Sequence, residues 1–250
     1  MLCPYLCMLS ELFTYITTRC PRYVRRMGYL SEAIGLKCRY KRHLDSWRHH
    51  LEKTRQFVLF AASKSQRREK VIILGSGLLL DVPLETLSSM FREVVLIDIV
   101  CLPEVHRCIK GYDNVRFLQQ DVTNIAGTLY QNILYGRHEL PSADPVLPEI
   151  GKDTGLVISL NILSQLTVVL RKYALKKLTG IATDHVEAWC RQITESHMPS
   201  LCLCRAMFAS LPTTVIQSAT AMAELLRKAQ LYLEYPCPHP MIHGHGTLRR

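Results

Sequence analysis

The sequence predicts an α/β protein with a Rossmann-like, doubly wound and mostly parallel sheet, preceded by a helical N-terminal extension. Four short runs of apolar and β-branched residues, separated by helical stretches, predict the sheet. The charge distribution predicts the extension, because the excess of +10 lies in residues 1–70, which hold 15 Lys/Arg against 5 Asp/Glu. We therefore divide the chain into a basic helical extension (1–62), a linker (63–70) and a Rossmann-like domain (71–250).

The composition is that of a folded, globular protein. Hydrophobic residues make up 48% of the 250 residues and charged residues 21%, which excludes disorder as the main state. No uninterrupted apolar run reaches the roughly 18 residues that a bilayer-spanning helix needs, so we expect no membrane span. The ten cysteines lie mostly in apolar stretches, which indicates reduced thiols and a cytoplasmic protein.

The basic extension has helical periodicity. In residues 44–62, Leu44, Trp47, Leu51 and Val58 recur at intervals of three, four or seven, while the basic residues lie off this face. One interpretation is that residues 19–70 bind RNA or another polyanion. The other is that the charges form the solvated outer face of helices packed against the body. The sequence leaves both open.

The domain begins with a strand, a glycine turn and a helix. Residues 71–74 form a buried strand, Gly75-Ser76-Gly77 follows at once, and Pro83 opens a helix that runs to Phe91. This arrangement brings backbone N–H groups close to an anionic or polar ligand. Glycine suits the turn because a Cβ would block the close approach of the ligand.

Polar residues follow each of the later strands. Asp98 ends the strand over 94–98, Asp121 follows the strand over 115–118, and Asn161 follows the strand over 156–160. Ligands of open parallel sheets bind at the carboxyl ends of the strands, so these residues are candidates for one site. A carboxylate there can accept both hydroxyl hydrogens of a ribose.

This order resembles the class I S-adenosylmethionine-dependent methyltransferase superfamily, over residues 71–170. The stretches VIILGSGLLLDVPL and LVISLNILSQL also resemble a group of uncharacterised bacterial proteins of that fold. The resemblance implies S-adenosylmethionine as cofactor. It implies that Gly75, Ser76 and Gly77 form the cofactor turn, that Asp98 binds the ribose, and that Asp121 contacts the adenine amino group with Val122 beside the ring.

The resemblance also implies where the acceptor binds. The segment after the fourth strand faces the methyl group, which makes Asn161, Ser164 and Gln165 the candidate catalytic residues. The family usually has an acidic residue two positions before the first glycine, where this chain has Ile73. Asp81, just beyond the turn, can replace that acid near the methionine end of the cofactor. The acceptor itself stays unidentified.

Structural roles compete with these assignments. Asp81 and Asp121 are also suitable helix caps, and Asn161 with Ser164 suits a turn. The third glycine of the family's turn is Leu79 here, which is compatible with a catalytically inactive binding module whose basic helices hold a partner. An NAD-dependent oxidoreductase is a further alternative, although its fingerprint needs Gly or Ala where this chain has Leu80.

Three weaker patterns complete the sequence analysis. Cys237, His239 and two later histidines are metal-type ligands, but the prolines between them favour a tail, so we assign no metal site. Leu201 to Phe208 suggests an apolar strand. His185 and His197 lie near where a fifth strand would begin, so either can face the cleft as a general base, although a lone histidine more often has a structural role.

Overall fold

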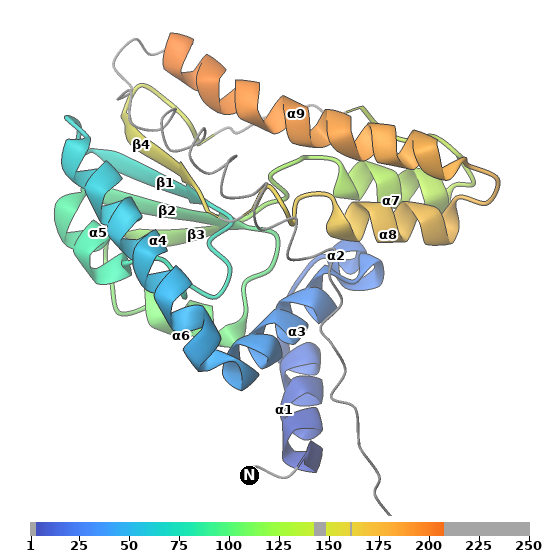
Figure 1. The fold of residues 1–250 in the computed structure, drawn as a ribbon, viewed down its shortest axis with the longest axis horizontal. Helices are drawn as coiled ribbons and strands as arrows, with labels where there is room; N and C mark the ends of the chain where they lie inside the picture. The colour runs from blue at the N-terminus through green and yellow to red at the C-terminus, as the bar shows by residue number, and fades with distance from the viewer. Residues whose placement is uncertain (1–3, 143–148, 161, 208–250) are drawn as a thin grey trace, which may run out of the picture.

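The computed structural model describes residues 4–142, 149–160 and 162–207 (Figure 1). Within this part the sheet consists of β1 (Lys70–Leu74), β2 (Glu93–Asp98), β3 (Val115–Gln119) and β4 (Thr154–Ser159). The helices before the sheet are α1 (Pro4–Thr17), α2 (Arg22–Met27), α3 (Tyr29–Arg42) and α4 (Leu44–Lys64). The later helices are α5 (Leu84–Met90), α6 (Pro103–Ile109), α7 (Ala126–Leu134), α8 (Val168–Lys177) and α9 (Thr183–Met207).

The sheet confirms the predicted fold class. All its strands are parallel and lie in the order β3-β2-β1-β4, which is the order of the first half of a Rossmann-like sheet. The strand order reverses between β1 and β4, because the chain continues from β1 to β2 on one side of the sheet and from β4 to α8 on the other side of β1. In open α/β sheets this reversal creates the crevice where ligands bind.

One face of the sheet is covered by α4, α5 and α6 (Figure 1). Val71 and Ile73 of β1 are fully buried on this face and pack in the same cluster as Val58 and Ala62 of α4. Of the residues that carry the periodicity over 44–62, Val58 lies on the sheet and Leu51 is buried, whereas Leu44 is 47% exposed. The opposite face carries an alternate set of buried side chains, including Ile72 and Leu74.

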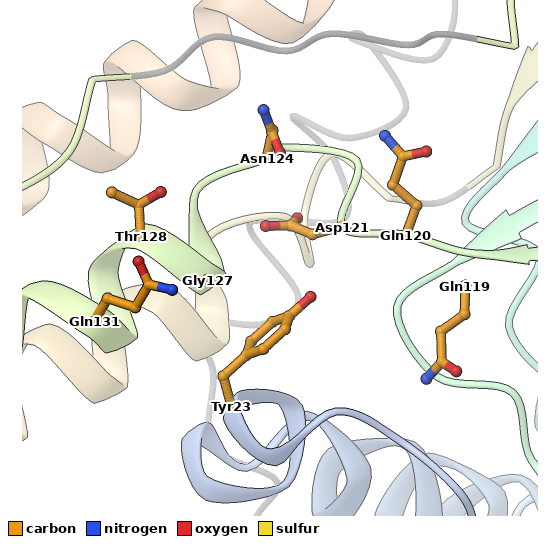
Figure 2. Close-up of a pocket in the computed structure, with 8 residues that line it drawn as sticks. All are labelled: Tyr23, Gln119, Gln120, Asp121, Asn124, Gly127, Thr128 and Gln131. Atoms are coloured by element: carbon orange, nitrogen blue, oxygen red, sulfur yellow. The ribbon is translucent and has the colours of Figure 1, made fainter. Parts of the chain in front are cut away.

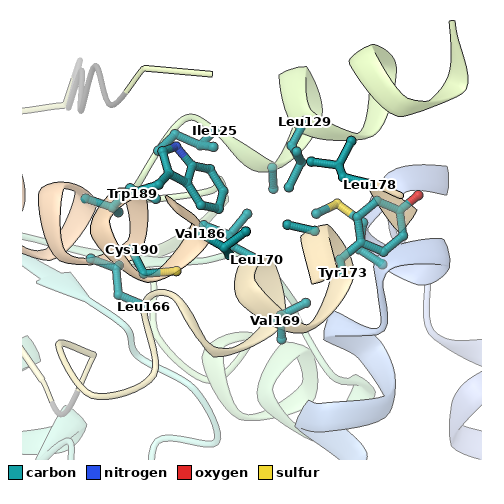
Figure 3. Close-up of a cluster of buried hydrophobic side chains, with 14 residues drawn as sticks. Ile125, Leu129, Leu166, Val169, Leu170, Tyr173, Leu178, Val186, Trp189 and Cys190 are labelled. Carbon is teal, nitrogen blue, oxygen red and sulfur yellow. The ribbon is translucent and has the colours of Figure 1, made fainter. Parts of the chain in front are cut away.

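The helices α7, α8 and α9 form a second layer beside the carboxyl ends of the strands (Figures 1 and 3). Their core contains Leu129 of α7, Leu170 of α8 and Trp189 of α9. Met27 of α2 packs into the same cluster, so the N-terminal region contributes to this layer. The Trp189 indole N–H donates to the carbonyl of Pro141 at 2.7 Å, which satisfies its polar group in this core.

The helices α2 and α3 lie against the loop that follows β2. Val24, Leu30 and Ile34 are buried with Val100 and Leu102 of that loop. Gly28 joins the two helices with φ of 104°, a left-handed conformation that favours glycine. The N-terminal helices therefore border the edge of the sheet where the candidate site was predicted.

The connection between α4 and β1 is short and fixed. Ser65 is buried, and its hydroxyl donates to the carbonyls of Arg67 and Gly155 at 2.8 and 3.0 Å. A Cβ on Gly155 would lie 2.5 Å from the Arg67 carbonyl oxygen, so the chain passes very close to β4. Residues 63–70 thus include the end of α4 and the start of β1.

The expected strand over 201–208 is wrong, because α9 continues to Met207. The run Leu201-Cys202-Leu203-Cys204 is apolar throughout, and such a run does not distinguish a buried strand from a helix. Among the described residues, none of the helices has the combination of length and apolar character that crossing a bilayer requires.

Candidate functional site

The strand register brings the predicted polar residues to one edge. Leu74, the last residue of β1, pairs with Ile97 on one side and Ser159 on the other. Asp98 in turn pairs with Gln119, the last residue of β3. The glycine turn, Asp98 and the loop that holds Asp121 therefore follow one another along the carboxyl edge of the sheet.

The glycine turn has the backbone that its sequence demands. Gly75 and Gly77 have φ of 74° and 48°, in the left-handed region. A Cβ on Gly75 would lie 2.9 Å from the Leu160 carbonyl oxygen and 3.0 Å from the Ile162 Cβ. Gly75 therefore permits close contact between the loops after β1 and β4, a structural requirement that exists without any ligand.

Asp98 is held against this turn. Its Oδ2 accepts a hydrogen bond from the backbone N–H of Gly77 at 2.8 Å, and its Oδ1 accepts one from Val100 at 3.3 Å. Burial raises the pKa of the Asp98 carboxyl above its ordinary value, and backbone hydrogen bonds, foremost that from Gly77, act in the opposite direction. These contacts fix the carboxylate and leave it lone pairs for a ligand.

Ser76, between the two glycines, has an unsatisfied hydroxyl. Its side chain is 1% exposed, and within the described part of the chain its Oγ has no hydrogen-bond partner. Buried hydroxyls in folded proteins are nearly always satisfied by protein, water or ligand. This atom marks the glycine turn as a place where a bound group can complete the hydrogen bonding.

Leu79, where the turn of the resembled family has its third glycine, has a left-handed backbone conformation. Its φ is 61°, which is uncommon for a residue with a side chain. The side chain packs beside Val24 and Leu30 of the N-terminal helices. Asp81, two residues further on, is not the N-cap of α5, because Pro83 holds that position.

Asp121 has a well-defined structural role. Its Oδ1 accepts hydrogen bonds from the N–H and the hydroxyl of Thr123, at 2.9 and 2.7 Å. Its Oδ2 accepts them from the N–H groups of Ile125 and Ala126, at 3.0 and 2.8 Å. These four donors occupy the lone-pair sites of the carboxylate, so Asp121 caps the start of α7. An adenine amino group would have to displace one of them.

A polar pocket of about 290 Å³ lies next to Asp121, between the end of β3, α7 and α2 (Figure 2). It is lined by amides, hydroxyls and one carboxylate: Tyr23, Gln119, Gln120, Asp121, Asn124, Gly127, Thr128 and Gln131. Burial and then the charge of Asp121 raise the pKa of Tyr23, so its phenol is a neutral donor at pH 7. Sequence reasoning missed Tyr23, because it comes from α2, about 100 residues before Asp121 in the sequence.

The remaining predicted residues are dispersed. Val122 is buried against the sheet, in the cluster of Ile72 and Leu74. Ser164 and Gln165 are exposed in the turn before α8. Asn161 lies outside the described residues. The cofactor and acceptor roles of these residues stay predictions. Among the predicted residues that the structure describes, a hydrogen bond joins Gly77 of the glycine turn to Asp98.

A serine–histidine pair, with the histidine buried and the serine partly exposed, lies at the end of β4. Ser159 Oγ and His197 Nε2 are 3.2 Å apart, and His197 is 2% exposed on α9. Burial lowers the pKa of His197 from 6.5 to about 4, so the ring is neutral at pH 7. His185, the other candidate base, is exposed on the same helix. The sequence named His197, but it contained no signal for its pairing with Ser159.

No metal centre is present among the described side chains, where no group of three His, Cys, Asp or Glu residues is placed to hold an ion. Cys237, His239, His243 and His245 lie outside that part of the chain. Comparison with protein-family models and with curated proteins finds no match for this chain. The function must therefore be argued from the carboxyl edge of the sheet.

Proposed function

We propose that this protein is an S-adenosylmethionine-dependent methyltransferase whose acceptor is unidentified. One observation carries the proposal: Asp98, at the end of β2, accepts a hydrogen bond from Gly77 in the turn after β1. The two functional elements of a nucleoside-binding edge are thus adjacent, in a parallel sheet of the appropriate strand order.

The residues present are compatible with this cofactor. Asp98 offers a fixed carboxylate for the two ribose hydroxyls. The side of Gly77 on which a Cβ would lie is open, with the nearest heavy atom 3.9 Å away, so a ligand can approach the backbone there. The unsatisfied Ser76 hydroxyl lies in the same turn. The pocket beside Asp121 offers amide donors and acceptors for a nucleobase, and Gln120 and Asn124 can replace Asp121 as the acceptor for an amino group.

When bound, S-adenosylmethionine supplies an electrophilic methyl group on a sulfonium. Asp98 and the glycine turn bind and orient the nucleoside, which leaves the protein to place an acceptor in line with the methyl group. Ser159, at the end of β4, lies within hydrogen-bond distance of the neutral ring of His197, which can orient the serine hydroxyl toward an acceptor.

The proposal is tested by methyl incorporation from labelled cofactor into fractions of a cell extract. We expect the wild type to label at least one fraction. Asp98→Asn should lose most of this activity, because a carboxamide accepts poorly from two hydroxyls. Asp184→Asn, an exposed substitution in the first turn of α9, is the matched control and should retain it. No labelling of any fraction by the wild type contradicts the proposal.

A second candidate function is a non-catalytic binding module of the same fold. It is favoured by Leu79, whose side chain fills the position of the family's third glycine and packs against the N-terminal helices. In either case we propose a cytoplasmic protein, since Cys20, Cys101, Cys108 and Cys190, among the described residues, are not in disulfides. We also propose that the basic segment 19–70 binds RNA or another polyanion.

A further inference from the structure

The junction of α3 and α4 carries a dense group of exposed cations. We define the α3–α4 corner as residues 39–53, which contain five Lys/Arg against two Asp/Glu. The five cations are exposed: Arg39, Lys41, Arg42, Arg48 and Lys53. Three exposed histidines, His43, His49 and His50, lie between them. Leu51 is the buried residue of the corner, and the other residues of 39–53 are exposed or partly exposed.

The cations of the corner are largely uncompensated. Within the described part of the chain its one ion pair joins Arg48 to Asp45 at 3.1 Å, and both side chains are at least 80% exposed. An exposed pair of this kind is weak and can be exchanged for another anion. Elsewhere the same region does pair its charges, as Lys37 does with Glu104 at 2.7 Å. Four of the five cations of the corner therefore have no ion pair among the described residues.

Two half-buried aromatic rings lie within this group. The ring centroids of Tyr40 and Trp47 are 6.0 Å apart, with planes tilted by 58°. Tyr40 comes from the last turns of α3 and Trp47 from the first turn of α4, so the pair spans the junction. Both side chains remain partly exposed, unlike the core-facing Leu51 one turn later.

We propose that the α3–α4 corner binds single-stranded RNA, with bases stacking on Tyr40 and Trp47 and phosphates held by the surrounding cations. Aromatic rings amid Lys and Arg are the chemistry of single-strand recognition, because every base has a face that stacks and every linkage carries a charge. A lipid surface fits less well, since Leu44 is the one strongly exposed large hydrophobic residue of the corner among those described.

This inference deepens the polyanion proposal and does not depend on methyl transfer. The link to the catalytic edge is α3, which starts against the loop after Asp98 through Leu30 and ends at the corner. With 14 residues it is about 20 Å long at 1.5 Å per residue. A bound strand can therefore reach from the corner toward the edge of the sheet.

The test uses the full chain and a labelled single-stranded RNA of mixed sequence, with fluorescence anisotropy over a series of salt concentrations. Lys41→Gln with Arg42→Gln should weaken binding about tenfold or more. It should also reduce the slope of log affinity against log salt by roughly 1.4, that is about 0.7 for each lost phosphate contact. Lys176→Gln with Lys177→Gln, an exposed pair on α8, is the matched control and should change both values little.

The aromatic pair gives a second, independent readout. Trp47→Ala should weaken binding by about fivefold to a hundredfold while leaving the salt slope unchanged, because stacking releases no counterions. Trp47→Phe should restore most of the affinity. A loss that Trp47→Phe does not restore, or that comes with a changed slope, contradicts stacking.

Three outcomes overturn the proposal. The first is that the wild type does not bind the RNA. The second is that the α8 control loses as much affinity as the corner variant, which indicates a diffuse charge effect. The third is tighter binding to anionic phospholipid vesicles than to RNA, lost equally in the corner variant. Titration of the same proteins with S-adenosylhomocysteine separates the two proposals, since failure there removes methyl transfer but leaves the RNA surface standing.

Discussion

At the scale of single residues, Gly75 has the most restrictive environment in the glycine turn. Its left-handed φ of 74° and the 2.9 Å approach to the Leu160 carbonyl both exclude a side chain. We expect Gly75→Ala to destabilise the protein by about 2 kcal/mol or more, from conformational strain and steric contact together. Urea unfolding measures this loss.

Gly180→Ala is the matched control for that measurement. Gly180 also has a left-handed φ, 85°, but nothing lies within 4 Å of the position that a Cβ would take there. It should therefore lose only the conformational part, about 1 kcal/mol. Equal losses for the two variants would show that the contact with the loop after β4 does not constrain Gly75.

The sequence predicted some residues of this edge well and others poorly. Gly75, Gly77 and Asp98 could be found because a glycine turn and a strand-end acid are local signals, and the register then brings them together. Asp121 was found for the same reason. Its four hydrogen-bond donors, however, come from the residues that follow it, and a sequence pattern does not distinguish an acid that caps a helix from one that binds a ligand. Tyr23 could not be predicted as a pocket residue, because it lies on α2, which is far from the other pocket residues in the sequence.

At the scale of helices and strands, the prediction was accurate where periodicity was clear. Each strand of the sheet was located to within two residues, because buried parallel strands are compact apolar runs between breakers. The end of α9 was wrongly predicted as a strand, because the run from Leu201 to Cys204 contains apolar residues only and therefore shows no helical periodicity. The hydrophobic pattern of a helix did not indicate which face of the sheet that helix covers.

The long helix α9 should make stability depend on pH through His197. The folded pKa is about 4 against 6.5 for an unperturbed histidine, so between these values the unfolded chain binds the proton and the folded chain does not. Stability is therefore full above pH 6.5 and decreases as the pH falls toward 4. At pH 5 the loss from this group is about 2 kcal/mol relative to pH 7.

Urea unfolding at pH 7 and pH 5 tests this assignment. His197→Gln should unfold with a smaller difference between the two pH values than the wild type. His185→Gln, an exposed substitution on the same helix, should keep the wild-type difference. If His197→Gln keeps it as well, the buried ring next to Ser159 is not the titrating group.

At the scale of the whole molecule, the N-terminal helices are part of the core and not only an appendage. Val24, Leu30 and Val58 are each 0% exposed, in contact with the loop after β2 or with the sheet. Burial of three such side chains contributes about 5–9 kcal/mol, which is comparable to the total stability of a domain. Deletion of residues 1–62 should therefore leave a body that does not fold cooperatively.

A shorter deletion provides the control. Residues 1–17 include α1, which contributes no fully buried apolar side chain among its described residues. Removal of 1–17 should leave a cooperative thermal transition, whereas removal of 1–62 should abolish it. A cooperative transition after the longer deletion would contradict the packing of α2 to α4 described above.

The central claim, that the edge formed by the glycine turn and Asp98 binds the nucleoside of S-adenosylmethionine, is tested most directly by calorimetric titration with S-adenosylhomocysteine. The wild type should bind it and should not bind NAD. Asp98→Ala should lose about 1–3 kcal/mol of binding free energy, because the ribose hydroxyls lose their acceptor, while Asp184→Ala should lose none. Tight binding of NAD, or equal affinity of Asp98→Ala and the wild type for S-adenosylhomocysteine, would contradict the account.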